Sequence, residues 1–193
     1  MRTLSIKNKL LKLATGSLLC STLLVTSAQA FDEKREGFIL GLGAGLSSVT
    51  TDVSVSGYSG SFDETSFGFA TSLKIGYGFN EQFSLYYVRN ASWFGYDDDP
   101  YDDTYASGIS GVGASYYINP NDPAYVMAAI GFGDFTNASE NEGEKGSAFM
   151  LGGGYEIYPH LQLEGTYLVS SIEEDGVDLT TSAFQLTINY LWY

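Results

Sequence analysis

Apolar and small residues alternate along most of this chain with a period of two. The clearest example is the segment 37–49, in which Phe38, Leu40 and Leu42 share one face and the opposite face is mostly glycine and serine. Only Ile39 departs from this alternation. Successive side chains of a β-strand point to opposite faces, so a period of two over this length predicts a strand.

The same alternation returns in seven further segments. Each is long enough to cross the hydrocarbon layer of a membrane as a tilted strand, which takes about 9–11 residues. The pattern therefore predicts an all-β protein that forms an eight-stranded antiparallel transmembrane β-barrel. The eight predicted strands are 37–49, 66–79, 83–94, 106–118, 124–135, 146–157, 161–171 and 181–193.

The connections between these strands alternate between short and long. Short turns are expected at 80–82, 119–123 and 158–160, whereas the other four connections are longer and rich in acidic residues. Short turns on one side and long loops on the other are typical of an outer-membrane barrel with both chain ends in the periplasm. We therefore expect four long outer loops and three short periplasmic turns.

The composition of the two faces decides which of them meets lipid. A soluble ligand-binding barrel turns its large apolar residues inward and shows charged residues to water. Here the face opposite the aromatic residues is mostly Gly, Ser and Ala, which fits the crowded interior of a small barrel. Tyr and Trp residues near the strand ends fit the aromatic girdles of outer-membrane barrels. A secreted soluble barrel is the alternative.

The first thirty residues have the three parts of a secretory signal peptide. Four basic residues within the first twelve precede a mostly apolar stretch, 13–25, and Ala28-Gln29-Ala30 provides an A-x-A cleavage site. A lipoprotein signal with Cys20 as the lipidated residue is the alternative, and it is disfavoured because Leu19 stands where a small residue is expected. We expect residues 1–30 to be cleaved and residues 31–193 to form the barrel domain.

Removal of this segment makes the chain strongly acidic. Five basic residues are then left against all 23 acidic ones, which gives a net charge of −18. A chain with this charge is not expected to bind nucleic acid. Cys20 is the only cysteine, so no disulfide can form in the mature chain.

Three stretches of sequence carry a resemblance to a known family. GFILGLGAGL at 37–46, KIGYGFNEQFSLYY at 74–87 and AFQLTINYLWY at 183–193 resemble strands of small outer-membrane β-barrel proteins, whose best-known members are OmpX and the membrane domain of OmpA. The resemblance implies a barrel inserted by the barrel-assembly machinery, which in this family recognises a final strand ending in an aromatic residue. We expect a monomer surrounded by outer-membrane lipid and lipopolysaccharide.

Tyr193 matches that aromatic ending but is out of phase with its strand. The apolar residues of the last segment alternate up to Trp192, so Tyr193 falls on the opposite face. Either Trp192 is the recognised aromatic residue or the strand contains a bulge.

Four charged residues are expected inside the barrel. Lys74, Glu156 and Glu164 are predicted to point inward. We expect Arg89 to join them in a polar network that fills the lumen, with an ion pair between Lys74 and Glu164. The alternation of its own strand would instead place Arg89 in lipid at a cost of up to ~2–4 kcal/mol, unless a bulge at 86–88 or an early end of the membrane relieves it.

The chain offers little for catalysis or metal binding. His160 is the only histidine and falls in a predicted periplasmic turn, so neither a Ser-His-Asp triad nor a histidine-based metal site can be assembled. The densest acidic cluster is a weak candidate site for Ca²⁺ or Mg²⁺, but it lacks the ligand spacing and glycine of a calcium loop. A solvated loop tip is favoured, and no cofactor is expected. The cluster consists of Asp97, Asp98, Asp99, Asp102 and Asp103.

These features favour a structural role, in which a membrane anchor displays acidic loops at the cell surface. Binding or adhesion through those loops, to a ligand, a cation or another surface, is the second hypothesis, and ordered loop strands with an apolar edge would favour it. A narrow channel ranks third, because an eight-stranded barrel is barely wide enough for its own side chains. An enzyme ranks last.

Overall fold

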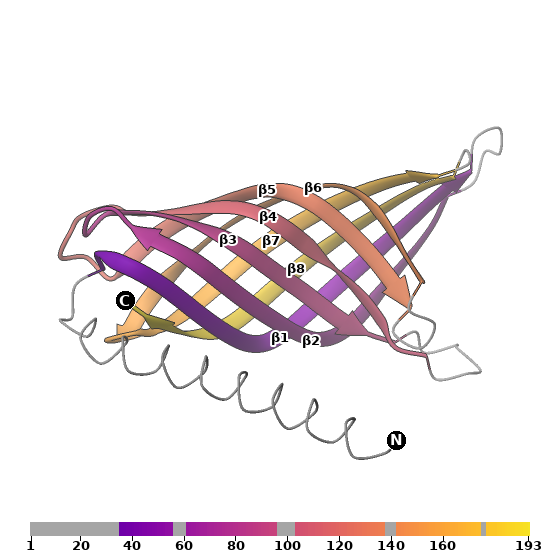
Figure 1. Ribbon diagram of the computed structural model, residues 1–193. Helices are drawn as coiled ribbons and strands as arrows, with labels where there is room; N and C mark the ends of the chain where they lie inside the picture. Colours follow the sequence, from indigo (N-terminus) through magenta and orange to yellow (C-terminus); the bar gives the residue numbers. More distant parts are fainter. Residues whose placement is uncertain (1–34, 56–60, 96–102, 138–141, 175–176) are drawn as a thin grey trace, which may run out of the picture.

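The protein forms a single closed sheet of eight strands (Figure 1). The computed structural model describes residues 35–55, 61–95, 103–137, 142–174 and 177–193, so the predicted signal peptide lies outside the described residues. Each strand pairs antiparallel with its neighbour in sequence, and β1 pairs with β8. The predicted all-β, eight-stranded antiparallel barrel is confirmed. The strands are β1 (Gly37–Val55), β2 (Ser61–Gly78), β3 (Phe83–Phe94), β4 (Tyr105–Tyr117), β5 (Ala124–Asn137), β6 (Glu142–Tyr158), β7 (Leu161–Glu174) and β8 (Val177–Trp192).

The strand ends near the short turns lie within one or two residues of the predicted positions. At the opposite end, which we call the outer end, β1, β2, β6, β7 and β8 extend several residues further than predicted. These extensions are mostly polar: β1 continues through Thr50 and Asp52, and β2 begins before Glu64. Above the apolar wall neither face of a strand has to be apolar, so the hydrophobic pattern stops before the strand does.

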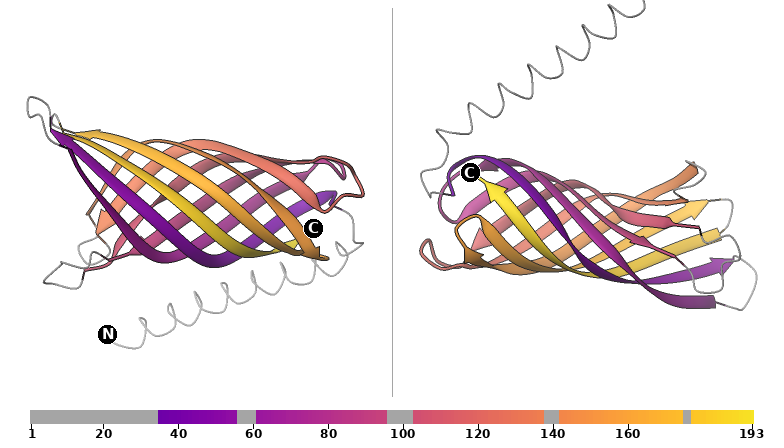
Figure 2. Two further views of the ribbon diagram at one scale, coloured as in Figure 1. Left: turned by 180° about the vertical axis from the view of Figure 1, so that it is seen from behind. Right: turned by 90° about the horizontal axis from the view of Figure 1, so that it is seen from below.

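The strands are strongly tilted, as Figures 1 and 2 show. Paired residues can be followed once around the barrel from Gly78 of β2, and the path returns to β2 at Gly68, ten residues nearer the outer end. A stagger of this size is linked to a strand tilt of about 35–45°. Directly paired residues therefore rise toward the outer end in the order β2 to β8.

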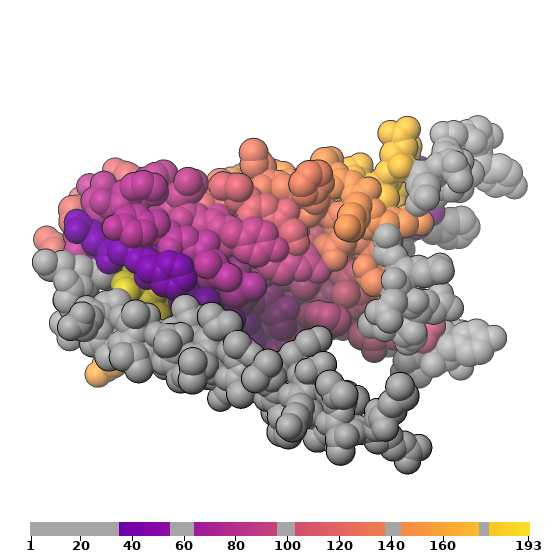
Figure 3. Space-filling model, in the orientation of Figure 1, coloured from indigo at the N-terminus to yellow at the C-terminus, as the bar shows by residue number. Residues whose placement is uncertain are grey.

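The two faces of the wall divide as the alternation predicts. Large apolar side chains point outward, where Phe67 is 83% exposed and Leu46 and Phe132 are each 72% exposed. Figure 3 shows one side of this outer wall. An apolar surface that surrounds the whole barrel requires lipid rather than water around it. No helix within the described ranges is long and apolar enough to cross a membrane.

Small residues on the inner face make room for the large side chains that fill the lumen. A Cβ atom on Gly154 would lie only 2.4 Å from Tyr125 Oη, and one on Gly113 would lie 2.6 Å from the ring of Tyr86. Polar side chains also connect opposite walls: Asn90 Nδ2 of β3 donates to Gln185 Oε1 of β8 at 3.1 Å. The lumen is thus a packed interior of mixed polarity.

Candidate functional site

The candidate site is a chain of polar contacts that runs from the middle of the lumen to its periplasmic mouth. It begins at the buried ion pair between Lys74 of β2 and Glu164 of β7, whose side chains are 2% and 0% exposed. These two residues lie together as the sequence led us to expect. An isolated charge in such surroundings is very unfavourable, and the opposite charge compensates it. The ammonium group of Lys74 also lies over the rings of Tyr86 and Tyr125, at 5.4 and 5.8 Å from their centroids.

Tyr125 and Gln162 continue the chain toward the periplasmic end. The Tyr125 hydroxyl lies 2.7 Å from Glu164 Oε2 and 2.9 Å from Gln162 Oε1. The amide nitrogen of Gln162 donates to Tyr117 Oη at 2.7 Å and to Tyr193 Oη at 3.1 Å. Every link is within hydrogen-bond distance, so the side chains fix one another across β4, β5, β7 and the residue after β8.

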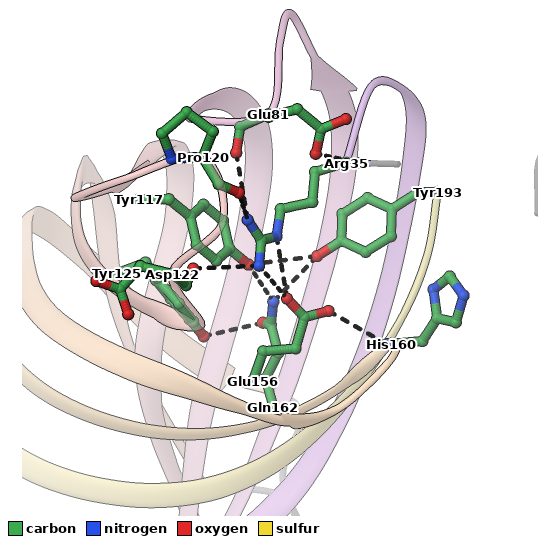
Figure 4. Close-up of polar contacts among 10 residues, drawn as sticks. All are labelled: Arg35, Glu81, Tyr117, Pro120, Asp122, Tyr125, Glu156, His160, Gln162 and Tyr193. Carbon is green, nitrogen blue, oxygen red and sulfur yellow. Dashed lines mark hydrogen bonds and ion pairs between the residues drawn. The ribbon is translucent and has the colours of Figure 1, made fainter. Parts of the chain in front are cut away.

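Arg35 closes the periplasmic mouth (Figure 4). It precedes β1, and its guanidinium group lies 3.8 Å above the ring of Tyr117. Arg35 Nη2 and Nε donate to Glu156 Oε2 at 2.7 and 3.0 Å. Arg35 Nη1 and Nη2 also donate to the main-chain oxygens of Pro120 and Asp122, at 2.8 and 3.2 Å. One side chain therefore connects the start of β1 with the end of β6 and the turn between β4 and β5.

These contacts stabilise the charged form of Arg35. Burial by itself would lower its pKa, but the hydrogen bond and the negative charge of Glu156 outweigh burial, so the pKa of Arg35 is raised above its ordinary value. The sequence-based network included Glu156 but not Arg35. The signal for Arg35 was its place just before the first predicted strand, at the same end of the barrel as Glu156 before the third short turn.

Tyr193 lies inside the barrel mouth. Besides its contact with Gln162, its hydroxyl is 3.4 Å from Tyr117 Oη, and burial raises its pKa well above the ordinary value. The pairing of β8 with β1 and β7 shows no register shift, so the bulge that we considered is not present. Trp192 consequently shares the outer face with Tyr190, their rings 4.7 Å apart. Of the two aromatic residues, Trp192 has the lipid-facing position, and its recognition during assembly stays a prediction.

Arg89 corrects the predicted lumen network. β3 pairs with β2 and β4 without a shift, so there is no bulge at 86–88 and Arg89 shares the outward face with Leu85 and Tyr87. Its Nη1 and Nη2 atoms donate to Asp134 Oδ1 and Oδ2 at 2.6 and 2.7 Å. Gly108 lies beneath, where a Cβ atom would be 2.7 Å from Arg89 Nη1. The prediction of a lumen position for Arg89 is wrong because a carboxylate and a glycine far away in the sequence accommodate the cation on the outer wall.

The remaining candidate residues do not form a site in the described chain. Asp97, Asp98, Asp99 and Asp102 lie outside the described residues, and Asp103 accepts a hydrogen bond from Asn137 Nδ2 at 3.1 Å. Among the described residues no three His, Cys, Asp or Glu side chains come together as metal ligands would. His160 lies in the turn before β7 with a φ of 69°, and its main-chain N–H donates to Glu156 Oε1 at 3.2 Å.

The closed sheet, the apolar outer wall and the packed polar lumen define a small transmembrane barrel of the outer membrane. Residues 17–191 match the family described as outer membrane protein beta-barrel domain, and the chain belongs to that family. It is a protein of the Gram-negative outer membrane. No curated protein matches the chain.

Two solved structures illustrate the shared fold. Ail, the attachment invasion locus protein of Yersinia pestis, has 16% sequence identity and a TM-score of 0.50, covering 80% of this chain and 99% of that chain. The outer membrane protein OprG from Pseudomonas aeruginosa has 11% identity and a TM-score of 0.51, covering 83% and 99%. At these identities the likeness is one of fold.

Proposed function

We propose that this protein is a closed barrel anchor that presents an acidic surface outside the cell and passes no solute. The observation that carries the proposal is the polar chain from Lys74 to Arg35, which occupies the lumen and its periplasmic mouth. A cavity beside this chain, between Lys74, Tyr86 and Tyr117, has a volume of about 10 Å³. That is room for about one water molecule, which is too little for a solute path.

The strand extensions support surface presentation. The β1–β2 ladder continues to Ser54 and Ser61, well beyond Leu46 and Phe67, the outermost large apolar residues on the outer faces of these strands. Exposed carboxylates occur on these extensions, at Glu64, Glu173 and Asp178. A rigid, acidic rim that stands above the lipid is what an anchor for surface display would need. His160, the single histidine, contributes its main chain to the periplasmic turn, which agrees with a non-enzymatic role.

Planar-bilayer recordings test the closed lumen. The refolded protein should give no stable conductance steps, because its lumen side chains occupy the conducting path. A variant with Tyr117→Ser, Tyr125→Ser and Tyr193→Ser removes three rings from that path and should give small, frequent steps. Replacement of the outward-facing Tyr116, Tyr155 and Tyr190 by serine is the matched control and should conduct no better than the native protein. Discrete steps from the native barrel would overturn the proposal and favour a channel.

A second candidate function, adhesion, is favoured by the way the barrel wall ends. The β2–β3 ladder stops at Gly68 and Phe94, and the β6–β7 ladder stops at Ser147 and Ser171. The ladders β7–β8, β8–β1 and β1–β2 continue further. The β5–β6 ladder also continues, to Asn137 and Glu142, but without pairing to β7. Within the described residues, β7, β8, β1 and β2 thus form one continuous four-stranded extension, and residues 61–67 of β2 form one of its edges. An unpaired strand edge can add a strand from another chain.

Hydrogen exchange on the refolded protein tests this second function. In the free protein the amides of 61–67 that point away from β1 should exchange faster than those of 68–78, which are paired on both sides. In a screen of extended β-prone peptides, a peptide that binds by strand addition should slow exchange in 61–67 and leave 68–78 unchanged. Binding that protects no amide in 61–67 would count against adhesion through this edge.

A further inference from the structure

Two basic residues lie on either side of one aspartate on the outer wall of an otherwise acidic protein. The described chain contains four basic residues, of which Lys74 lies in the lumen and Arg35 in the periplasmic mouth. The other two, Arg89 and Lys145, both face outward. Whereas acidic residues are spread over the outer rim, these two cations lie beside the same residue, and this arrangement calls for a physical reason.

Asp134 of β5 is the neighbour that the two cations share. Arg89 reaches it from β3 with both terminal nitrogens of its guanidinium group. Lys145 of β6 is paired directly with Asp134 in the β5–β6 ladder and is exposed. Lys145 takes part in no ion pair with the described residues. One carboxylate therefore has a cation on each side of it along the outer wall.

Arg89, Asp134 and Lys145 lie at the outer border of the apolar wall. On β5, Phe132 is 72% exposed and Asp134 is the next outward residue toward the outer end. On β6, Phe149 is 44% exposed, and Ser147 and Lys145 follow it outward. Because paired residues rise from β3 to β5, Asp134 lies higher than Arg89, and the guanidinium group is directed from the apolar wall toward its border.

We propose that Arg89 and Lys145 bind a phosphate group carried by a lipid of the outer leaflet. The side chain of Arg89 is 28% exposed although Asp134 occupies one edge of its guanidinium group, which leaves N–H donors for a second anion. Guanidinium and ammonium groups are the usual partners of phosphate oxygens. A phosphate fixed to a lipid is held at this height by its acyl chains, which lie against the apolar residues below. Asp134 competes with the phosphate for Arg89 and limits the strength of binding. This site is on the outer wall and does not depend on whether the lumen is closed.

Native mass spectrometry of the detergent-refolded protein, titrated with bisphosphorylated lipid A, tests the proposal. The native protein should bind this lipid about tenfold more tightly than the same lipid after removal of both phosphates. Lys145→Gln and the double variant Arg89→Gln with Asp134→Asn, which leaves the net charge unchanged, should each remove most of that difference. Glu64→Gln, a charge change on the exposed rim of β2, is the control and should leave the preference intact.

The single variant Asp134→Asn separates a lipid site from a purely structural ion pair. If Arg89 binds lipid phosphate, loss of the competing carboxylate should strengthen binding of bisphosphorylated lipid A severalfold. Weaker binding in this variant, when a cold-against-boiled gel shows a folded barrel, would overturn the proposal. Equal affinity of the native protein for the two forms of the lipid would do so too. The proposal would also be overturned if millimolar inorganic phosphate displaced bound lipid A as effectively as added lipid A does, because the site would then bind free phosphate.

Discussion

Replacing Glu164 with leucine is expected to lower the free energy of unfolding by about 3–5 kcal/mol. The substitution leaves the ammonium group of Lys74 buried without its counter-charge and removes an acceptor from the Tyr125 hydroxyl. The neighbouring cavity, of about 10 Å³, has room for about one water molecule, which does not replace the lost counter-charge. Equilibrium urea unfolding in detergent, followed by tryptophan fluorescence, measures the change.

The double variant Lys74→Met with Glu164→Leu is the control for this result. It removes both charges and keeps the volume of the side chains, so its stability should lie within about 1–2 kcal/mol of the native protein. The contrast between the single and double variants identifies the unpaired charge as the cause of the loss. If both variants lost the same stability, packing or the Tyr125 contact would be responsible instead of the ion pair.

Gly45→Ala is expected to interfere with closure of the barrel. Gly45 of β1 faces Thr187 of β8, at the seam where the first and last strands meet. A Cβ atom on Gly45 would lie 1.9 Å from the main-chain oxygen of Leu186, and only a shift of the backbone could relieve that contact. We expect a loss of about 3 kcal/mol or more and a smaller fraction of the heat-modifiable folded form on a cold-against-boiled gel.

Gly165→Ala is the matched control for the seam variant. The same methyl group on β7 would have Phe184 Cζ at 3.9 Å as its nearest neighbour, which is an ordinary contact. This variant should refold as well as the native protein and unfold at the same urea concentration. A Gly45→Ala protein that behaved like it would show that the seam can adjust without cost.

The strands were predictable where lipid constrains them. The alternation around Leu42 and around Phe69 reflects a wall with lipid on one side and a crowded lumen on the other, and this requirement is local in sequence. Thr50 and Asp52 lie above the lipid. There the strand is stabilised by its backbone hydrogen bonds with β2 and β8, which do not require alternating apolar residues. The outer extensions therefore had no signal in the hydrophobic positions.

The polar site was predictable only in part. Lys74 and Glu164 stood out because charged residues on a face of Gly, Ser and Ala need a partner. Arg35 lies outside any strand, so no alternation could orient it, and its contacts come from the turn after β4 and from the end of β6, much later in the sequence. Arg89 was in the lipid-facing phase from the beginning, and what the sequence did not reveal was its partner Asp134.

The contacts of Arg35 in the periplasmic mouth show that the two ends of the barrel lie close together. Arg35 stands before the first strand and Tyr193 after the last, yet both reach the same tyrosine, Tyr117, in the periplasmic mouth. The two ends of the described barrel are therefore neighbours in space, at the same rim as the three short turns. A peptide link between those ends, with a cut at the turn after Tyr117, would leave every pairing around the ring unchanged. The order in which the strands are connected is thus one of several that this ring of strands can accommodate.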